Sequence, residues 1–271
     1  MKIASLQPSI SIILDGLGCL DQLVACTRYC LTAVPALRDR QITVVHDSWS
    51  TTAEELLAMR PDLVMASVPY RNESLAAILK AGCPVLALAP HTLADIEQDI
   101  RLIAAITGAT ARGEQIVAAM SEAVSEMRRY TADLPDKPLV YCEEWGKPLI
   151  HSQLWVRELV EAAGGVFLGE PGKVTSAEAV AAADPDVIIA AWCGAGDRVP
   201  LEKIVEQRSW EGLRAVRGRR VYCVADELLN TPAPTLIDGL YALAGAIHPE
   251  IFGGPGEPSL RRIPPISVSS V

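Results

Sequence analysis

One stretch of sequence occurs twice, as TTAEELLAMRPDLVMA at residues 51–66 and as TSAEAVAAADPDVIIA at residues 175–190. The two copies align without a gap at an offset of 124 positions (175 minus 51). Thr, Ala, Glu, Pro and Asp recur at matching places within them. We interpret this as an internal duplication that organises the chain into two related halves.

Each copy predicts a helix, a turn and a buried strand. A Thr or Ser directly before Ala-Glu is typical of a helix N-cap, and acidic residues are favoured in the first turn by the helix dipole. The Pro-Asp pair ends the helix, because the residue before proline avoids the α region. The apolar runs that follow, Leu63–Met65 and Val187–Ile189, are typical of parallel strands that are buried on both faces.

Matching elements surround the repeat in both halves. Each half opens with a strand-like run and continues after the repeat with a predicted helix and strand. These segments are Lys2–Leu6, Leu75–Ala81 and Val85–Leu88 in the first half, and Pro138–Cys142, Leu201–Val216 and Val221–Val224 in the second. Alternation of helices and strands predicts an α/β fold with a parallel, doubly wound (Rossmann-like) sheet in each half.

A single long helix is predicted between the halves. Apolar residues recur at helical spacing there, at Ile116, Val117, Met120, Val124 and Met127. A helix of about twenty residues spans about 30 Å, long enough for a stiff backbone between two lobes. We therefore predict an N-terminal lobe at 1–106, a connecting helix at 107–133, a C-terminal lobe at 134–252 and a flexible tail at 253–271.

Composition excludes several classes of protein. The net charge is −9, and an acidic chain repels phosphate backbones, so nucleic acid is not expected as a partner. No apolar run is long enough to predict a membrane span. The seven cysteines form no CxxC pair, and we predict that they are buried, reduced thiols.

The N-terminus leaves the compartment open. Met1 leads directly into strand-like sequence, with no apolar core or cleavage site of a secretory signal. Two alternatives follow: a periplasmic or extracytoplasmic protein whose leader has been removed, or a cytoplasmic protein that starts at Met1.

Aromatic residues mark the predicted ligand site. In open α/β sheets, ligands bind beyond the carboxyl ends of the strands. Trp49, Tyr70, Trp145 and Trp192 all fall in loops near predicted strands, in a chain with only 5% aromatic residues. Their flat surfaces suit a planar apolar ligand held in a cleft between the lobes. Trp155 and Trp210 are interpreted as packing residues.

Enzymatic alternatives have weaker support. No GxGxxG or Walker-type phosphate loop is present, and the four histidines have no metal-binding spacing. Glu143 and Glu144, at a predicted strand end, are candidates for acid–base work together with His151. His46 is a candidate for reaching a bound metal from the edge of the cleft. We predict a binding protein without catalytic residues and without a required cofactor.

Six segments of the chain follow the pattern of a known family: Ile3–Ser9, Asp15–Gly18, Glu54–Val64, Gly82–Val85, Trp155–Gly165 and Pro232–Leu240. They resemble the matching segments of cluster-A class III periplasmic binding proteins, the receptors of cobalamin, haem and siderophore importers. It covers roughly residues 1–250 and is strongest toward cobalamin-binding proteins and helical-backbone metal receptors. It implies two α/β lobes, one backbone helix and limited hinge motion.

The resemblance also implies a ligand and partners. Aromatic side chains of both lobes cradle the corrin in cobalamin binders, and Trp49, Trp145 and Trp192 fall at corresponding loops, whereas a further family Trp is replaced near Ser67. Tyr70, Pro8 and Asn230 complete the candidate ligand contacts. Glu73 and Glu202 match, the latter more loosely, the glutamates that dock on the permease of an ABC importer.

We therefore predict a substrate-binding protein for a metal chelate, with cobalamin or another corrinoid as the first candidate. The alternatives are a haem receptor with Tyr70 or His46 as the axial ligand, a siderophore receptor, and a cytosolic corrinoid sensor or enzyme on the same fold. A siderophore ranks lower because the loops offer few cations beyond Arg71 and Lys147.

Overall fold

The computed structural model describes residues 1–253 and 260–262. The chain divides into two compact units. Unit 1 comprises Met1–Met120 with Pro232–Pro234, and unit 2 comprises Ser121–Thr231 with Thr235–Val271. Each unit is an α/β structure built on its own sheet, as the sequence predicts.

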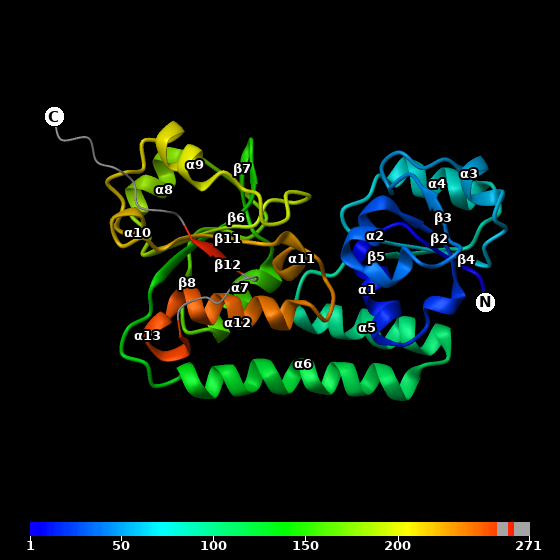
Figure 1. Cartoon of the computed structure of the whole chain (residues 1–271), viewed down its shortest axis with the longest axis horizontal. Coiled ribbons are helices and arrows are strands. Elements are labelled where there is room, and N and C mark those ends of the chain that lie inside the picture. The colour runs from blue at the N-terminus through cyan, green and yellow to red at the C-terminus, as the bar shows by residue number, and fades with distance from the viewer. Residues whose placement is uncertain (254–259, 263–271) are drawn as a thin grey trace. The chain divides into compact units, whose positions relative to one another are not determined.

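Unit 1 has a parallel five-stranded sheet in the order β3-β2-β1-β4-β5. Helices α1 and α5 lie on one side of this sheet, and α3 and α4 pack together on the other (Figure 1). The strands are β1 (Ile3–Ser5), β2 (Leu23–Thr27), β3 (Thr43–Val45), β4 (Leu63–Ser67) and β5 (Val85–Leu88). The helices are α1 (Pro8–Gly16), α2 (Arg28–Ala33), α3 (Ala53–Leu57), α4 (Asn72–Lys80) and α5 (Leu93–Thr107).

Unit 2 has a mixed seven-stranded sheet in the order β12-β11-β10-β6-β7-β9, with β8 paired to β6. The strands are β6 (Leu139–Gly146), β7 (Leu149–His151), β8 (Val166–Phe167), β9 (Val174–Thr175), β10 (Val187–Ala190), β11 (Val221–Val224) and β12 (Leu260–Arg262). The helices are α7 (Leu154–Ala162), α8 (Ala177–Ala183), α9 (Leu201–Gln207), α10 (Arg214–Arg217), α11 (Asp226–Leu229), α12 (Leu236–Ile247) and α13 (Pro249–Phe252).

The parallel pairing predicted for unit 2 holds for β6, β8, β10 and β11 only. Strands β7, β9 and β12 are antiparallel additions. A hairpin joins β6 to β7, so this part of the sheet needs no crossover helix.

The duplicated stretch forms the predicted helix, turn and strand in both units, as α3–β4 and α8–β10. Thr52 and Ser176 cap the two helices by accepting the backbone N–H three residues on. The residues before the two prolines, Arg60 and Asp184, have φ of 48° and 46°. The residue before each proline therefore lies in the left-handed region, rather than in the extended region expected there.

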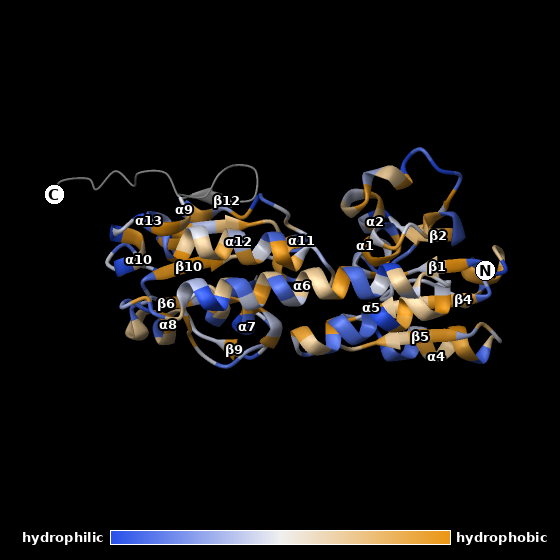
Figure 2. Ribbon diagram, turned by 90° about the horizontal axis from the view of Figure 1, so that it is seen from below, coloured by the Kyte–Doolittle hydropathy of each residue, from blue (hydrophilic) through white to orange (hydrophobic). Residues whose placement is uncertain are grey.

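The connecting helix α6 (Thr110–Thr131) begins three residues later than expected. Helix α5 ends at Thr107, and Gly108 at φ 79° separates the two helices. The residues Met1–Met120 belong to unit 1, so α6 contributes its first half to unit 1 and its second half to unit 2. Apolar and polar residues alternate along it (Figure 2), and its buried apolar side chains are those of Val117, Met120, Val124 and Met127.

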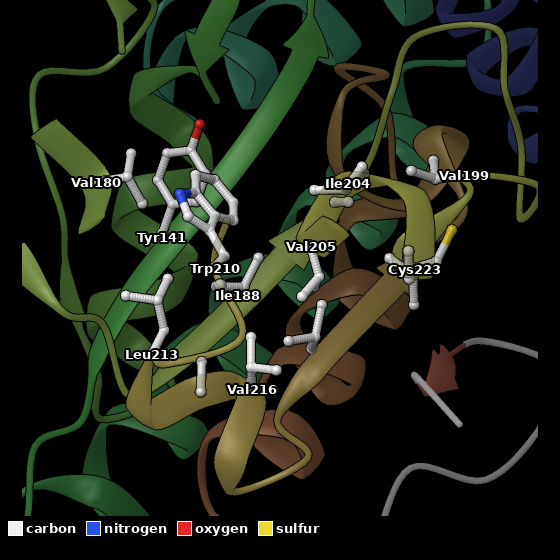
Figure 3. Close-up of a cluster of buried hydrophobic side chains, with 14 residues drawn as sticks. Tyr141, Val180, Ile188, Val199, Ile204, Val205, Trp210, Leu213, Val216 and Cys223 are labelled. Carbon is white, nitrogen blue, oxygen red and sulfur yellow. The ribbon is translucent and has the colours of Figure 1, made fainter. Parts of the chain in front are cut away.

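Each unit has its own hydrophobic core. In unit 1, Leu56 of α3 is fully buried against strands β1, β2 and β4. In unit 2, the cluster drawn in Figure 3 packs Tyr141 of β6 beside Trp210, with their rings edge to face at 5.9 Å. Trp155 and Trp210 are buried, which confirms that they are packing residues. The seven cysteines are free thiols, all buried except Cys193, which is partly exposed.

Three sequence predictions need correction. Strand β6 extends to Gly146, so Glu143 and Glu144 lie inside the strand rather than at its end, and Trp145 lies inside it rather than in the loop that follows. The helix expected at Leu201–Val216 is broken into α9 and α10, with Ser209 at φ 54° between them. The segment 253–271 was predicted to be a flexible tail, but it contains strand β12, which pairs with β11. The rest of that prediction, at residues 254–259 and 263–271, lies outside the described residues.

Candidate functional site

The carboxyl edge of the unit 1 sheet has a switch point between β1 and β4. The chain leaves these neighbouring strands toward opposite sides of the sheet, which opens a crevice where doubly wound folds bind ligands. The loops that follow β1 and β4 carry Pro8, the first residue of α1, and Tyr70. His46 and Trp49 follow the end of β3.

Gln7 ties these loops together, and sequence analysis missed this role. Its side-chain amide donates to Ser48 Oγ at 2.8 Å and to the carbonyl of Pro69. Ser48 Oγ also donates to the Pro69 carbonyl at 3.1 Å. One buried hydroxyl and one amide therefore connect the loops after β1, β3 and β4, which places the neighbouring Trp49 and Tyr70 at one edge.

Trp49 is held by its backbone and leaves its ring in solvent. Its N–H donates to Asp47 Oδ1 at 3.1 Å, and Ser74 Oγ donates to its carbonyl at 3.2 Å. The residue is 54% exposed. Tyr70 is partly buried and packs against the unit 1 core, so it offers less surface. Pro8 is partly buried.

In unit 2, Trp145 and Trp192 reach the corresponding edge from two neighbouring strands. Trp145 lies near the end of β6 and is 44% exposed, and its Nε1 donates to the Lys147 carbonyl at 2.9 Å. Trp192 follows β10 and is partly buried, and its Nε1 donates to Glu143 Oε1 at 2.7 Å.

The loop after β10 is fixed by residues that follow β11. Asp226 accepts the backbone N–H groups of Gly194 and Gly196 at 2.8 and 2.9 Å. Asn230 donates from its side chain to the Ala191 carbonyl. Asn230 therefore belongs to the same edge as Trp192, although its amide nitrogen is used within the protein.

Glu144 is a half-buried carboxyl at this edge. It accepts hydrogen bonds from Gln153 Nε2 at 2.6 Å and from Cys193 Sγ at 3.6 Å. Burial raises the pKa of Glu144, and these two hydrogen bonds oppose the rise. These two hydrogen bonds fix the position of the carboxyl group at this edge of the sheet.

The candidate acid–base residues are committed to internal contacts. Glu143 is buried and forms an ion pair with Arg208, at 2.6 Å between Oε2 and Nη1. His151 is buried, and its ring lies nearly perpendicular to that of Tyr141 with the centroids 5.4 Å apart; its Nδ1 has no hydrogen-bond partner among the described residues. Burial lowers the pKa of His151, while the charge of Glu143 opposes that shift. Arg208 lies 65 positions from Glu143, and no local sequence signal links the two residues.

His46 is exposed, and its Nδ1 lies 3.0 Å from Glu55 Oε1. Within residues 1–253 and 260–262, no group of three or more His, Cys, Asp or Glu side chains is arranged to hold a metal ion. Among the described residues, His46 therefore has Glu55 as an acidic neighbour but no group of further side chains with which it could bind a metal ion.

The two candidate docking glutamates occupy similar positions in the two units. Glu73 lies in the first turn of α4 with its side chain 77% exposed, 3.4 Å from Arg71. Glu202 lies in the first turn of α9 and is exposed. Among the described helices, none combines the length and the hydropathy that crossing a membrane requires.

Comparison with known proteins identifies relatives along nearly the whole chain. The family model described as "Periplasmic binding protein" matches residues 3–228. An uncharacterized ABC transporter substrate-binding lipoprotein, YvrC of Bacillus subtilis, is 26% identical over 93% of this chain and 81% of its own length. A cobalamin-binding protein of Halobacterium salinarum is 23% identical over 91% of this chain and 69% of its own length.

A solved structure has a similar fold. The periplasmic haem-binding protein RhuT of Roseiflexus sp. RS-1, in its apo form, superposes with a TM-score of 0.78. It is 25% identical in sequence, and the match covers 91% of this chain and 97% of that one. The cobalamin-binding relative and the haem-binding neighbour are thus named for different ligands.

Proposed function

Because the chain belongs to the periplasmic binding protein family, we propose that it binds a cobalamin-like corrinoid and delivers it to an ABC importer. The observation that supports this proposal is the set of aromatic side chains at the carboxyl edge of both sheets. Trp49 in unit 1 and Trp145 in unit 2 are about half exposed, at 54% and 44%. Exposed indoles at ligand-binding edges favour a large, flat, weakly polar ligand.

The polar groups at the edge in unit 2 also favour a corrinoid over a carboxylate-rich ligand. Glu144 and Asp226 form hydrogen bonds with the loop that follows β10. The positive charge of Arg208 is neutralised by its ion pair with the buried Glu143. Acidic groups repel the propionates of haem and the carboxylates of many siderophores. A corrinoid carries amides, which hydrogen-bond to carboxyl groups without opposing charge.

Haem is the second candidate. A haem-binding protein has a similar fold, and Tyr70 and His46 are the residues proposed for axial ligation. The pairing of His46 with Glu55 makes Tyr70 the better candidate of the two. An enzymatic role for Glu143 has less support, because its carboxylate already accepts hydrogen bonds from Trp192, Arg208 and Tyr141.

A titration with cyanocobalamin, cobinamide and haemin tests the ligand, with visible absorbance and tryptophan fluorescence as readouts. We expect saturable quenching by the corrinoids, and a raised Kd in Trp49→Ala and Trp192→Ala. Tyr130→Ala is the matched control, since this aromatic residue is 65% exposed on α6, away from the strand ends. A Soret shift with haemin alone would reassign the ligand, and no response to any of the three would exclude both macrocycles.

Delivery to an importer is tested separately. We propose that Glu73 and Glu202, exposed in the first turns of α4 and α9, are the permease-docking residues. Glu73→Lys and Glu202→Lys should leave ligand affinity unchanged and abolish stimulation of the cognate importer in vesicles. Glu211→Lys, at another exposed carboxylate of unit 2, is the control. Unchanged stimulation in both variants would contradict the docking assignment. This proposal places the protein outside the cytoplasmic membrane.

A further inference from the structure

The Glu143 carboxylate is the centre of a buried hydrogen-bond network in unit 2. Its side chain is 2% exposed. Oε1 accepts from Trp192 Nε1 at 2.7 Å and from Arg208 Nη2 at 3.0 Å. Oε2 accepts from Arg208 Nη1 at 2.6 Å and from the Tyr141 hydroxyl at 2.7 Å. A carboxylate has about four lone-pair sites, so all of them are used here.

The partners of Glu143 are themselves held in place. The Arg208 guanidinium lies over the Trp210 ring at 4.8 Å, and the Arg208 side chain is 11% exposed. Trp210 is fully buried, and its Nε1 donates to the Ala177 carbonyl at 3.1 Å. The acceptor for the Trp192 N–H is thus anchored by a paired charge and a packed aromatic residue, rather than by a mobile surface side chain.

Gly146 supports the same indole from the backbone of β6. A Cβ atom at residue 146 would lie 2.4 Å from Cζ2 of Trp192 and 2.9 Å from Cε2 and Cη2. The φ of Gly146 is outside the left-handed region, so backbone conformation does not require glycine here. Close approach of the Trp192 ring does require it. One side of the indole therefore rests on the strand, and its N–H edge points toward Glu143.

We propose that Glu143 and Gly146 are positioning residues that fix the plane of the Trp192 indole, which is partly buried and packs against the unit 2 core. This proposal rests on the proposed function for the identity of the ligand. The N–H of Trp192 is used internally, so the ring has no polar group to offer the ligand. Trp192 then contacts the face of a planar macrocycle by stacking and discriminates against flexible, polar chelators that lack such a face.

The positioning role is testable without any ligand. Labelling with 5-fluorotryptophan gives one ¹⁹F resonance for each of the five tryptophans, and the loss of one in Trp192→Phe assigns Trp192. We expect Gly146→Ala to shift the Trp192 resonance and to leave those of Trp49 and Trp155 in place. Gly212→Ala is the matched control, because a Cβ there meets no atom within 4 Å. An unchanged Trp192 resonance in Gly146→Ala would overturn the proposal.

Glu143→Gln tests the acceptor by the same readout. The amide keeps one oxygen and turns two N–H groups toward the donors of Arg208, so the Trp192 resonance should shift as well. Glu143→Gln removes the partner of a buried charge, and this loss can unfold the chain. If it does, the positioning role of the two residues is decided by Gly146→Ala, because that change alters no side chain of the hydrogen-bond network.

A double-mutant cycle with cyanocobalamin tests the link to recognition. We expect Gly146→Ala to raise Kd about tenfold, the size of effect expected for one aromatic contact. The same change in a Trp192→Ala background should have no further effect, because its target is gone. Equal effects in both backgrounds would mean that Gly146 acts on the fold and not through Trp192. If the wild type binds no corrinoid, the proposed function fails while the ¹⁹F result still decides the positioning role.

Discussion

At the scale of single residues, Glu144 should make the fold less stable as pH rises. Burial raises its pKa above the ordinary value of 4.5. Between these two pKa values the folded chain retains a proton that the unfolded chain has released, so the free energy of unfolding falls as pH increases through that window. Glu144→Gln should therefore be more stable than the wild type at neutral pH and should not differ below the ordinary pKa.

Urea unfolding between about pH 4 and about pH 8 measures this difference. Glu211→Gln is the control, because this carboxylate is exposed. A wild type and a Glu144→Gln variant with the same pH dependence would show that Glu144 ionises normally in the folded chain.

The matched residues Arg60 and Asp184 should respond differently to replacement by glycine. Both have positive φ, so glycine relieves about 1–2 kcal/mol of strain at either position. This gain is offset by about 0.5–1 kcal/mol of chain entropy. Asp184 Oδ1 also accepts the Arg214 N–H at 2.8 Å, whereas Arg60 is exposed and its side chain has no such partner among the residues that the structure describes.

Thus Arg60→Gly should leave the free energy of unfolding unchanged or slightly higher, and Asp184→Gly should lower it by about 1–2 kcal/mol through the lost hydrogen bonds. Chemical denaturation of both variants provides the comparison. Equal losses at the two positions would contradict the assigned role of the Arg214 contact.

Residue-level prediction from sequence succeeded where the signal was local. The indoles of Trp155 and Trp210 were assigned to packing, and both are buried. The hydrogen-bond network around Glu143 could not be predicted. A buried carboxylate inside a strand needs a partner that neutralises it, and the sequence near Glu143 does not show which residue that partner is. That partner, Arg208, is brought near by tertiary folding alone.

At the scale of elements, the two N-caps should stabilise their short helices. Thr52 Oγ1 accepts the Glu55 N–H, and Ser176 Oγ accepts the Ala179 N–H. Thr52→Ala and Ser176→Ala should each cost about 1 kcal/mol, measured by urea unfolding. The exchanges Thr52→Ser and Ser176→Thr keep the acceptor and should restore most of the stability. Equal losses in the exchanges would mean that the caps contribute nothing.

The elements that sequence predicted best are those of the duplicated unit, since capping, proline and apolar runs agree there. The elements it missed depend on pairing with another strand. Strand β7 exists because it pairs with β6, and β12 because it pairs with β11. Neither carries a periodicity strong enough to predict a strand by itself: each is three residues long.

At the scale of the whole molecule, the separate cores of the two units should make some mutations local in effect. Leu56 is fully buried in unit 1 and corresponds to Val180 of unit 2 in the duplication. Leu56→Ala should cost about 2–5 kcal/mol through the cavity it leaves. Hydrogen exchange measured by mass spectrometry should show faster exchange in peptides of unit 1 and little change in those of unit 2.

Leu57→Ala is the matched control, because this neighbour is 42% exposed. Equal acceleration of exchange in both units would show instead that they unfold as one cooperative body. The division into two α/β units could be predicted from sequence, because the duplicated stretch occurs once in each unit. The mixed pairing of the unit 2 sheet could not be predicted, because its antiparallel strands β7, β9 and β12 are only two or three residues long.

The partial exposure of Cys193 gives the protein a natural point of covalent attachment. The other six thiols are buried, and Cys193 directly follows Trp192. Burial, with the neighbouring carboxylates, raises the pKa of Cys193, so alkylation should be slow at neutral pH and accelerate in alkaline buffer. An iodoacetamide spin label or dye, which reacts with thiolates in alkaline buffer, would thereby mark one position of the unmutated chain, beside the indole assigned to ligand stacking.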